Sequence, residues 1–270
     1  MLQTNFSLEN RTAIVTGATG LLGRQHSIAL AAAGANVIAV DLCFEQCESL
    51  AAEISETFRT RSSAFCANIT KPESIELLRD EALRRYGAID ILVNNAAVDD
   101  VFRESAEDSH FESYRLESWQ RCIETNLTGT FVCSQVIGSK MASRGTGSII
   151  NIASTYGIVA PDQSIYRRPD GTQSFYKSAA YSTSKAGVLA LTRYLAAYWG
   201  SAGVRVNALS PGGVENMQEE YFIENYSART PMRRMAKPDD YCGAIVFLAS
   251  DASRYMTGAN LVVDGGWTIW

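Results

Sequence analysis

Short apolar runs alternate with longer helical stretches along this 270-residue chain, and this alternation restricts the fold more than any other feature. The apolar runs are rich in β-branched residues and lie at 11–16, 36–40, 89–93, 148–152, 204–208 and 260–263. The helical stretches lie at 24–33, 45–57, 72–86, 119–143, 179–200 and 238–249. Strands that alternate with helices form a parallel sheet with helices on both faces. We therefore predict an α/β protein with a doubly wound parallel sheet, whose ligands bind beyond the carboxyl ends of the strands.

Composition narrows the function classes. No repeat, low-complexity segment or linker marks a boundary, so we expect one domain over residues 1–270. The chain has 24 Lys and Arg against 29 Asp and Glu and no long basic block, which argues against a nucleic-acid partner. No apolar stretch reaches the ~20 residues of a membrane span, and no secretory signal is visible, so we expect a cytoplasmic protein. The six cysteines form no CxxC pair, which predicts reduced thiols and no metal site.

The first apolar run ends in a glycine-rich loop, TGATGLLG, at residues 16–23. Gly17 permits a tight turn, Gly20 lets backbone approach a pyrophosphate, and Gly23 lets helix and strand pack closely. The next run ends in Asp41, which follows Gly20 by about the ~20 residues expected of an acid that binds the adenine ribose. A carboxylate there repels a 2′-phosphate, so we expect NAD rather than NADP. The alternatives are that Asp41 caps a helix, and that Arg11 or Arg24 offsets the repulsion.

A second pattern is Tyr181-Ser-Thr-Ser-Lys185 at the start of a predicted helix. Residues four apart share a helix face, so the phenol and the ammonium group can lie close together. A nearby ammonium group stabilises phenolate and lowers a phenol pKa that is normally about 10, which makes tyrosine a plausible acid/base. The alternative is a buried ring with a solvated lysine. Tyr156, Tyr166 and Tyr176 have no lysine four residues later and are not candidates for this role.

Taken together, these motifs resemble the short-chain dehydrogenase/reductase family over essentially the whole chain. In chain order the resemblance rests on the glycine loop, Asp41, NNAA at 94–97, TNLTG around Asn126, NIAST around Ser154, Tyr181 with Lys185, and SPGG at 210–213. The family resemblance implies a single Rossmann domain, a dimer or tetramer, and hydride transfer between a nicotinamide and a carbonyl or alcohol carbon.

The resemblance also implies roles for individual residues. Tyr181 would be the catalytic acid/base, Lys185 would lower its pKa and hold the nicotinamide ribose, Ser154 would hydrogen-bond the reacting oxygen, and Asn126 would hold a water near the lysine. Asn126 could instead satisfy a kinked helix, and Ser154 could be a capping hydroxyl. The residues that would contact the cofactor, besides Tyr181 and Lys185, are Gly17, Thr19, Gly20, Leu21, Leu22, Gly23, Asp41, Leu42, Asn68, Ile69, Asn95, Ala96, Ala97, Pro211, Gly212 and Val214.

The chain departs from the family pattern in the 27 positions between Ser154 and Tyr181, about twice the usual gap. The gap indicates an insertion around residues 160–176, which we predict to be a substrate rim in which Arg167 and Arg168 meet a phosphate or carboxylate. A surface flap or a subunit contact is the alternative. The glycine spacing TGxxGxxG resembles the family's extended branch, and Asn68 stands where the family commonly has aspartate.

The segment around residues 213–235 is expected to cover the substrate, and it is amphipathic and polar, with no long apolar face. We therefore expect a small polar substrate such as a sugar, sugar acid or phosphorylated sugar. Several short stretches also resemble members linked to surface-glycan or flagellin-sugar modification. The alternatives are an NADPH-dependent 3-oxoacyl-type reductase and a dinucleotide-sensing protein without turnover. Trp267, Ile269 and Trp270 at the chain end predict a subunit interface in a homodimer or homotetramer.

Overall fold

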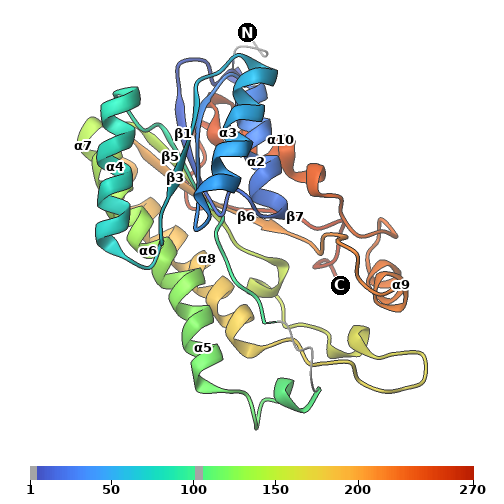
Figure 1. Ribbon diagram of the computed structural model, residues 1–270. Helices are drawn as coiled ribbons and strands as arrows, with labels where there is room; N and C mark the ends of the chain where they lie inside the picture. The colour runs from blue at the N-terminus through green and yellow to red at the C-terminus, as the bar shows by residue number, and fades with distance from the viewer. Residues whose placement is uncertain (1–4, 101–105) are drawn as a thin grey trace.

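The computed structural model describes residues 5–100 and 106–270. These residues form a parallel sheet of seven strands in the order β3-β2-β1-β4-β5-β6-β7, which confirms the predicted α/β class and Rossmann fold (Figure 1). The strands are β1 (Thr12–Thr16), β2 (Asn36–Asp41), β3 (Ser62–Cys66), β4 (Ile91–Asn94), β5 (Gly147–Ile152), β6 (Val204–Pro211) and β7 (Asn260–Val263). The strand order reverses between β1 and its neighbour β4, so a crevice opens at the carboxyl ends of these two strands.

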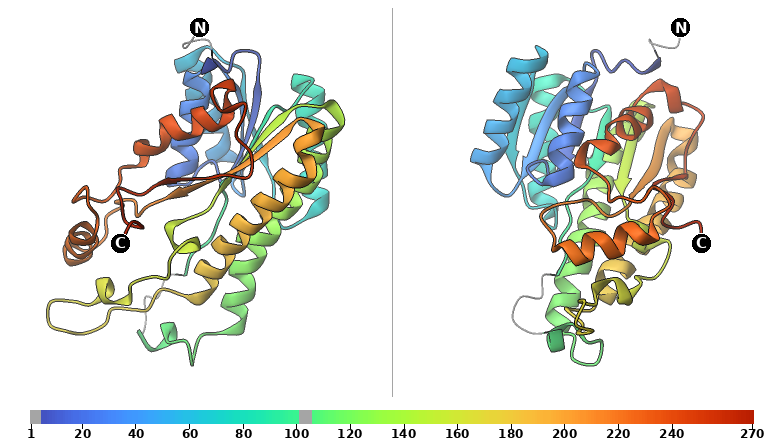
Figure 2. Two further views of the ribbon diagram at one scale, coloured as in Figure 1. Left: turned by 180° about the vertical axis from the view of Figure 1, so that it is seen from behind. Right: turned by 90° about the vertical axis from the view of Figure 1, so that its right-hand side faces the viewer.

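Helices cover both faces of the sheet (Figure 2). They are α2 (Leu21–Ala32), α3 (Phe44–Phe58), α4 (Pro72–Tyr86), α5 (Leu116–Ile123), α6 (Gly129–Cys133), α7 (Ser139–Arg144), α8 (Ala179–Trp199), α9 (Glu220–Arg229) and α10 (Cys242–Ala249). Alternate residues of β1 divide between the two cores: Ala13 and Val15 pack with α2, α3 and α10, and Ile14 packs with α4 and the α6–α8 side. No helix of the described residues is both long and apolar enough to cross a bilayer.

Two elements are missing from the sequence prediction. Strand β3 has the sequence SSAFC and lies at the edge of the sheet, where it needs no continuous apolar run. Helix α9 lies in the segment that we expected only to be a polar substrate cover. Elsewhere the predicted elements are present, with ends that shift by a few residues; α2, for example, begins at Leu21 rather than at Arg24.

Candidate active site

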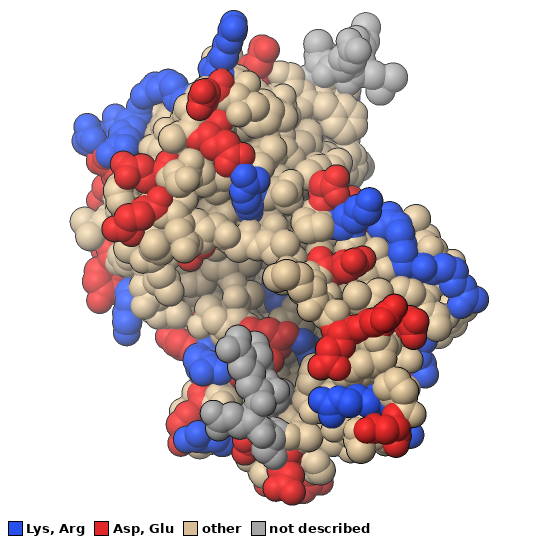
Figure 3. All heavy atoms as spheres, turned by 45° about the vertical axis from the view of Figure 1, so that its right-hand side comes forward, with Lys and Arg blue, Asp and Glu red and all other residues tan. Residues whose placement is uncertain are grey.

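One cleft of about 1010 Å³ lies at the carboxyl ends of the strands. All of the predicted site residues line this cleft except Gly23 and Asn126. The predicted residues that line it are Gly17, Thr19, Gly20, Leu21, Leu22, Asp41, Leu42, Asn68, Ile69, Asn95, Ala96, Ala97, Ser154, Tyr181, Lys185, Pro211, Gly212 and Val214. The sheet thus brings together motifs that are spread over about two hundred positions of the chain. Acidic and basic side chains are interspersed over the hollowed face in Figure 3.

The glycine loop is shaped by close backbone contacts. Gly17 has a φ of +63°, and a Cβ on Gly23 would lie 2.0 Å from the carbonyl oxygen of Gly17. Asn95, which follows β4, holds the loop from the other side because its Nδ2 donates to the carbonyl oxygens of Thr16 and Gly17, each at 3.0 Å. The loop is therefore fixed with the N-terminus of α2 facing the cleft, an arrangement that suits a pyrophosphate.

Asp41, the last residue of β2, also lies on the cleft. Its Oδ2 accepts hydrogen bonds from the backbone N–H of Thr19 at 3.1 Å and from Thr19 Oγ1 at 2.6 Å, and its Oδ1 accepts from the N–H of Leu42 at 2.8 Å. The carboxylate is thereby held beside the glycine loop. Arg24 is paired with Glu53 and Arg11 with Asp251, so neither guanidinium is directed to Asp41. The cradle at Gly17 and Gly23 and this carboxylate together fit a dinucleotide.

Ser154, Tyr181 and Lys185 meet at the other end of the cleft. Ser154 follows β5, and its Oγ accepts a hydrogen bond from the N–H of Tyr156 at 3.1 Å, so it does cap a short turn as well as face the cleft. Tyr181 and Lys185 are one turn apart on α8. Lys185 is buried, its Nζ lies 5.7 Å from the centroid of the Tyr181 ring, and it donates to the carbonyl oxygen of Ile152 at 2.8 Å.

At this end of the cleft the pKa of Tyr181 is shifted in the direction opposite to the one we expected. Burial, together with the negative charge of Asp99, raises the pKa of Tyr181 above its ordinary value, although a hydrogen bond with Ser154 opposes the shift. Burial lowers the pKa of Lys185 to about 8. The groups of the protein alone therefore favour the neutral phenol, the opposite of the lowering that we expected from Lys185, and Tyr181 is set up as a proton donor.

Asn126 lies in a π-helical turn, Glu124–Thr128, that interrupts the long helical segment from α5 to α7. Its Oδ1 accepts from the N–H of Val98 at 2.7 Å, and its Nδ2 donates to Val98 O at 2.9 Å and to Ser184 Oγ at 3.1 Å. The side chain thus ties the segment after β4 to α8, next to Lys185. These contacts position Asn126 between the two elements, and its role in holding a water near Lys185 stays a prediction.

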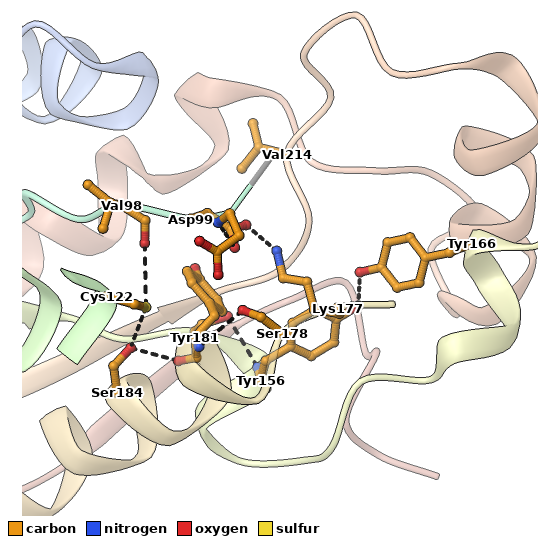
Figure 4. Close-up of polar contacts among 12 residues, drawn as sticks. Val98, Asp99, Cys122, Tyr156, Tyr166, Lys177, Ser178, Tyr181, Ser184 and Val214 are labelled. Atoms are coloured by element: carbon orange, nitrogen blue, oxygen red, sulfur yellow. Dashed lines mark hydrogen bonds and ion pairs between the residues drawn. The ribbon is translucent and has the colours of Figure 1, made fainter. Parts of the chain in front are cut away.

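The inserted segment 160–176 forms a small hairpin beside the cleft. Arg167 and Gln173 make an antiparallel bridge, and the N–H of Ser174 donates to Tyr166 O at 3.0 Å. Neither Arg167 nor Arg168 is among the residues that line the cleft, so the lining gives no support to their predicted contact with a phosphate or carboxylate. Tyr166 lines the cleft in their place, and its hydroxyl lies 3.1 Å from that of Tyr156 (Figure 4).

Sequence analysis also missed Lys177 and Asp99, which lie beside Tyr181 (Figure 4). They form an ion pair, and Lys177 Nζ lies 4.5 Å from the centroid of the Tyr181 ring. The available signal was the position of Lys177, four residues before Tyr181 and directly after the insertion. Asp99 gave no such signal, because its partner is 78 positions away in the chain.

A small apolar cluster closes the far side of the cleft. It contains the buried residues Ile165, Tyr166, Tyr226, Met235 and Trp267, and so joins the insertion, α9 and the C-terminal segment. Trp267 stacks on Tyr226 at 4.2 Å between ring centroids. The prediction of a subunit interface therefore fails for Trp267, which is buried within its own chain, whereas Ile269 and Trp270 are exposed.

Comparisons with protein-family profiles match the chain in two consecutive parts. Residues 11–167 match a family described as short chain dehydrogenase, and residues 170–268 match one described as Enoyl-(Acyl carrier protein) reductase. The two matches meet inside the inserted segment, so the hairpin lies between Ser154 and the pair Tyr181 and Lys185.

Individual relatives span nearly the full chain. A D-threitol dehydrogenase of Mycolicibacterium smegmatis is 36% identical, with 98% of this chain and 95% of the relative covered. An NAD-dependent glycerol dehydrogenase of Listeria innocua is 33% identical, with 98% and 96% covered. Among solved structures, a gluconate 5-dehydrogenase of Burkholderia cenocepacia in complex with NADP and tartrate superposes with a TM-score of 0.87 at 30% identity over 100% of both chains.

Proposed function

The chain belongs to the short-chain dehydrogenase/reductase family, and from this premise we propose that it oxidises a secondary alcohol of a small, polar, sugar-like substrate with NAD, or reduces the corresponding ketone. The observation that carries the proposal is that one cleft holds the glycine loop and Asp41 at one end and Ser154, Tyr181 and Lys185 at the other. The family's chemistry is that of a dehydrogenase acting on a CH–OH group with a nicotinamide dinucleotide. None of the families and relatives named above is described as acting in surface-glycan or flagellin-sugar modification, and we do not propose that role.

The chain's own residues divide the work of binding. Gly17, Gly20 and the N-terminus of α2 would hold the pyrophosphate, and Asp41 would accept hydrogen bonds from the adenine ribose. When bound, the dinucleotide supplies or accepts the hydride. Asp41 favours NAD because its carboxylate repels a 2′-phosphate, and the two guanidinium groups considered above, Arg11 and Arg24, are paired with other carboxylates.

At the reacting carbon, Ser154 would hydrogen-bond the substrate oxygen and Tyr181 would move the proton. In reduction the neutral Tyr181 phenol donates its proton to the developing alkoxide. In oxidation the phenolate takes the proton of the alcohol, a step that requires the pKa of Tyr181 to fall from its raised value. Lys185, which is a buried residue of α8, supplies positive charge next to the ring for that purpose.

The polar substrate is supported by the lining of the cleft and by the relatives. Asp99, Lys177, Asn216 and Gln218 line the substrate end together with tyrosines, and this lining suits a molecule with several hydroxyl groups better than a long acyl chain. The relatives named above act on threitol and glycerol, and others are described as 2-dehydro-3-deoxy-D-gluconate 5-dehydrogenases.

The decisive experiment is Tyr181→Phe in the purified protein, with NADH formation followed on a panel of polyols and sugar acids. We expect turnover to fall by at least about a hundredfold while NAD still binds by calorimetry, because only the proton-transfer group is removed. Tyr176→Phe is the matched control, since Tyr176 lies outside the cleft, and should keep its activity. Undiminished turnover in Tyr181→Phe would refute the assignment. Activity confined to 3-oxoacyl thioesters with NADPH would favour the reductase alternative.

We also propose that the protein is a homodimer or homotetramer. Tyr194 and Tyr198 stack on each other on the outer face of α8 and are both about 65% exposed, and Ile269 and Trp270 are exposed at the chain end. Such aromatic surface is depleted on monomers and enriched at interfaces. Replacing Tyr194 and Tyr198 with serine should lower the mass measured by light scattering, and an unchanged mass would exclude this face of α8 from the contact.

A further inference from the structure

The ion pair between Lys177 and Asp99 stands directly over the residue proposed to transfer the proton. Lys177 Nζ lies 4.5 Å from the ring centroid of Tyr181 and 6.0 Å from that of Tyr156, so the ammonium group is held between the two rings (Figure 4). The Lys177 side chain is 15% exposed and that of Asp99 is 39% exposed. Lys177 is thus largely buried whereas Asp99 is exposed, and both line the cleft, where a substrate hydroxyl beside the reacting carbon would lie.

The position of Lys177 is fixed by the insertion. The Gln163 side chain binds the backbone of Lys177 on both sides: its Oε1 accepts from Lys177 N at 2.8 Å, and its Nε2 donates to Lys177 O at 3.1 Å. Gln173 holds Gln163 in turn, with its Nε2 donating to Gln163 O at 2.7 Å. Two buried or half-buried amides therefore anchor the residue that carries the charge, which is the arrangement expected of a preorganised contact.

The charge balance of the cleft indicates which substrates this contact accepts. Within the described residues, three cationic side chains line the cleft: Arg121, Lys177 and Lys185. Arg121 pairs with the buried carboxylate of Asp100 at 2.9 Å, and Lys185 donates to a backbone carbonyl. Lys177 is neutralised by Asp99. An incoming carboxylate would meet Asp99 before it could reach an unpaired cation, and like charges at short range are costly.

We propose that the Lys177–Asp99 pair determines specificity by selecting neutral polyols against the corresponding sugar acids. The Asp99 carboxylate accepts a hydrogen bond from one substrate hydroxyl, the Lys177 ammonium donates to a neighbouring one, and the negative charge of Asp99 repels a carboxylate at the same place. This inference rests on the proposed dehydrogenase function and names the substrate class of that site.

The test compares substrate pairs that share their stereocentres and differ only in a CH₂OH group against a carboxylate: threitol with threonate, and D-glucitol with D-gluconate. For the wild type we expect kcat/KM to be higher for the polyol of each pair. In Asp99→Asn, which leaves Lys177 unpaired, the acid-to-polyol ratio of kcat/KM should rise by about tenfold or more, the effect of one partly screened charge. Asp108→Asn removes the same charge from an exposed position outside the cleft and should leave the ratio unchanged.

The double variant Asp99→Asn/Lys177→Met separates charge selection from a general disturbance of the site. In this variant, as in the wild type, the two positions together carry no net charge. The acid-to-polyol ratio of kcat/KM should therefore return to within about threefold of the wild-type value, even though the loss of both hydrogen-bonding groups lowers the activity on polyols. A wild type that prefers the acid, or a ratio that does not move in Asp99→Asn, would overturn the inference while leaving the dehydrogenase function standing. A wild type inactive on the whole alcohol panel would overturn the proposed function itself.

Discussion

Replacing Trp267 with alanine should weaken substrate binding far more than it weakens the sheet. Trp267 is 7% exposed and stacks on Tyr226 at an interplanar angle of 11°, and Tyr226 OH in turn accepts a hydrogen bond from the N–H of Gly213 at 2.5 Å. Truncating a buried tryptophan costs about 3–5 kcal/mol, of which the aromatic pair accounts for about 0.5–1.5 kcal/mol. The cluster to which Trp267 belongs is separate from the two cores that pack on the sheet.

The loss should therefore act on the docking of the segment 213–235 over the cleft. A cost of about 3 kcal/mol shifts that docking equilibrium by roughly 150-fold, and because the apparent affinity falls with the docked fraction, we expect KM for the substrate to rise by at least about tenfold. Among the predicted contacts of NAD only Val214 lies in this segment, and the glycine loop and Asp41 lie at the other end, so the affinity for NAD should change less than about threefold, and Tm by less than about 3 °C.

The assays are steady-state kinetics, calorimetric titration of NAD and a thermal melt, with hydrogen exchange of residues 213–235 as a direct readout of docking. Trp270→Ala is the matched control, because Trp270 is three residues away, is 75% exposed and should leave KM near the wild-type value. A fall in Tm of about 6 °C or more with KM unchanged would show that Trp267 belongs to the cooperative core, and would refute the reasoning.

Three further predictions concern the glycine loop, Lys185 and Asp41. Gly23→Ala should abolish NAD binding in calorimetry, because its Cβ would lie 2.0 Å from Gly17 O, whereas Gly87→Ala, with nothing within 4 Å, should cost only stability; retained binding in Gly23→Ala would contradict the close-packing argument. The pKa of Lys185 is lowered from 10.5 to about 8, so the folded state binds this proton less tightly than the unfolded state, and the penalty is full below pH 8 and is relieved between about pH 8 and 10.5. The wild type should accordingly gain Tm relative to Lys185→Met between pH 7 and pH 10, and a constant difference would refute the lowered pKa. Asp41→Asn should raise the NADP-to-NAD ratio of kcat/KM by about tenfold or more, because a charge that repels the 2′-phosphate is removed; an unmoved ratio would mean that another group selects the cofactor.

The sheet could be predicted because its strands carry their signal locally. Runs such as AIV in β1 and ILV in β4 are apolar in every position, which is typical of buried parallel strands. Strand β3 could not be found in this way because it lies at the edge, with Ser62 and Ser63 half-buried, and pairs on one side only with β2. The placement of the predicted catalytic and cofactor motifs at one cleft could also be predicted, because each motif is a short pattern directly after a strand or at the start of a helix.

The substrate end was less predictable because its contacts join distant segments. Arg167 and Arg168 were chosen for their charge, but neither lines the cleft, whereas Tyr166 and Lys177 do. The sequence also could not show whether the aromatic residues at the chain end are buried within the chain or against a second subunit. Their apolar character indicates burial, but only the fold shows that Trp267 packs against Tyr226 of the same chain. The raised pKa of Tyr181 likewise depends on burial and, after it, on Asp99, and no local pattern shows either of them.

The two hydrogen bonds between the Gln163 side chain and the backbone of Lys177 affect how the substrate specificity of this enzyme can change by mutation. They divide the insertion into an anchored base and a free tip, in which Gly171 has a φ of +87° and an added Cβ would have nothing within 4 Å. Mutations can accumulate in the tip, or a label or binding peptide can be grafted there, without disturbing the chemistry. A single exchange at Gln163, by contrast, would release Lys177 and change which molecules are accepted. The hairpin thus separates a neutral, variable surface from a control point for new specificity, and directed evolution of this enzyme should find its gains at the base of the loop.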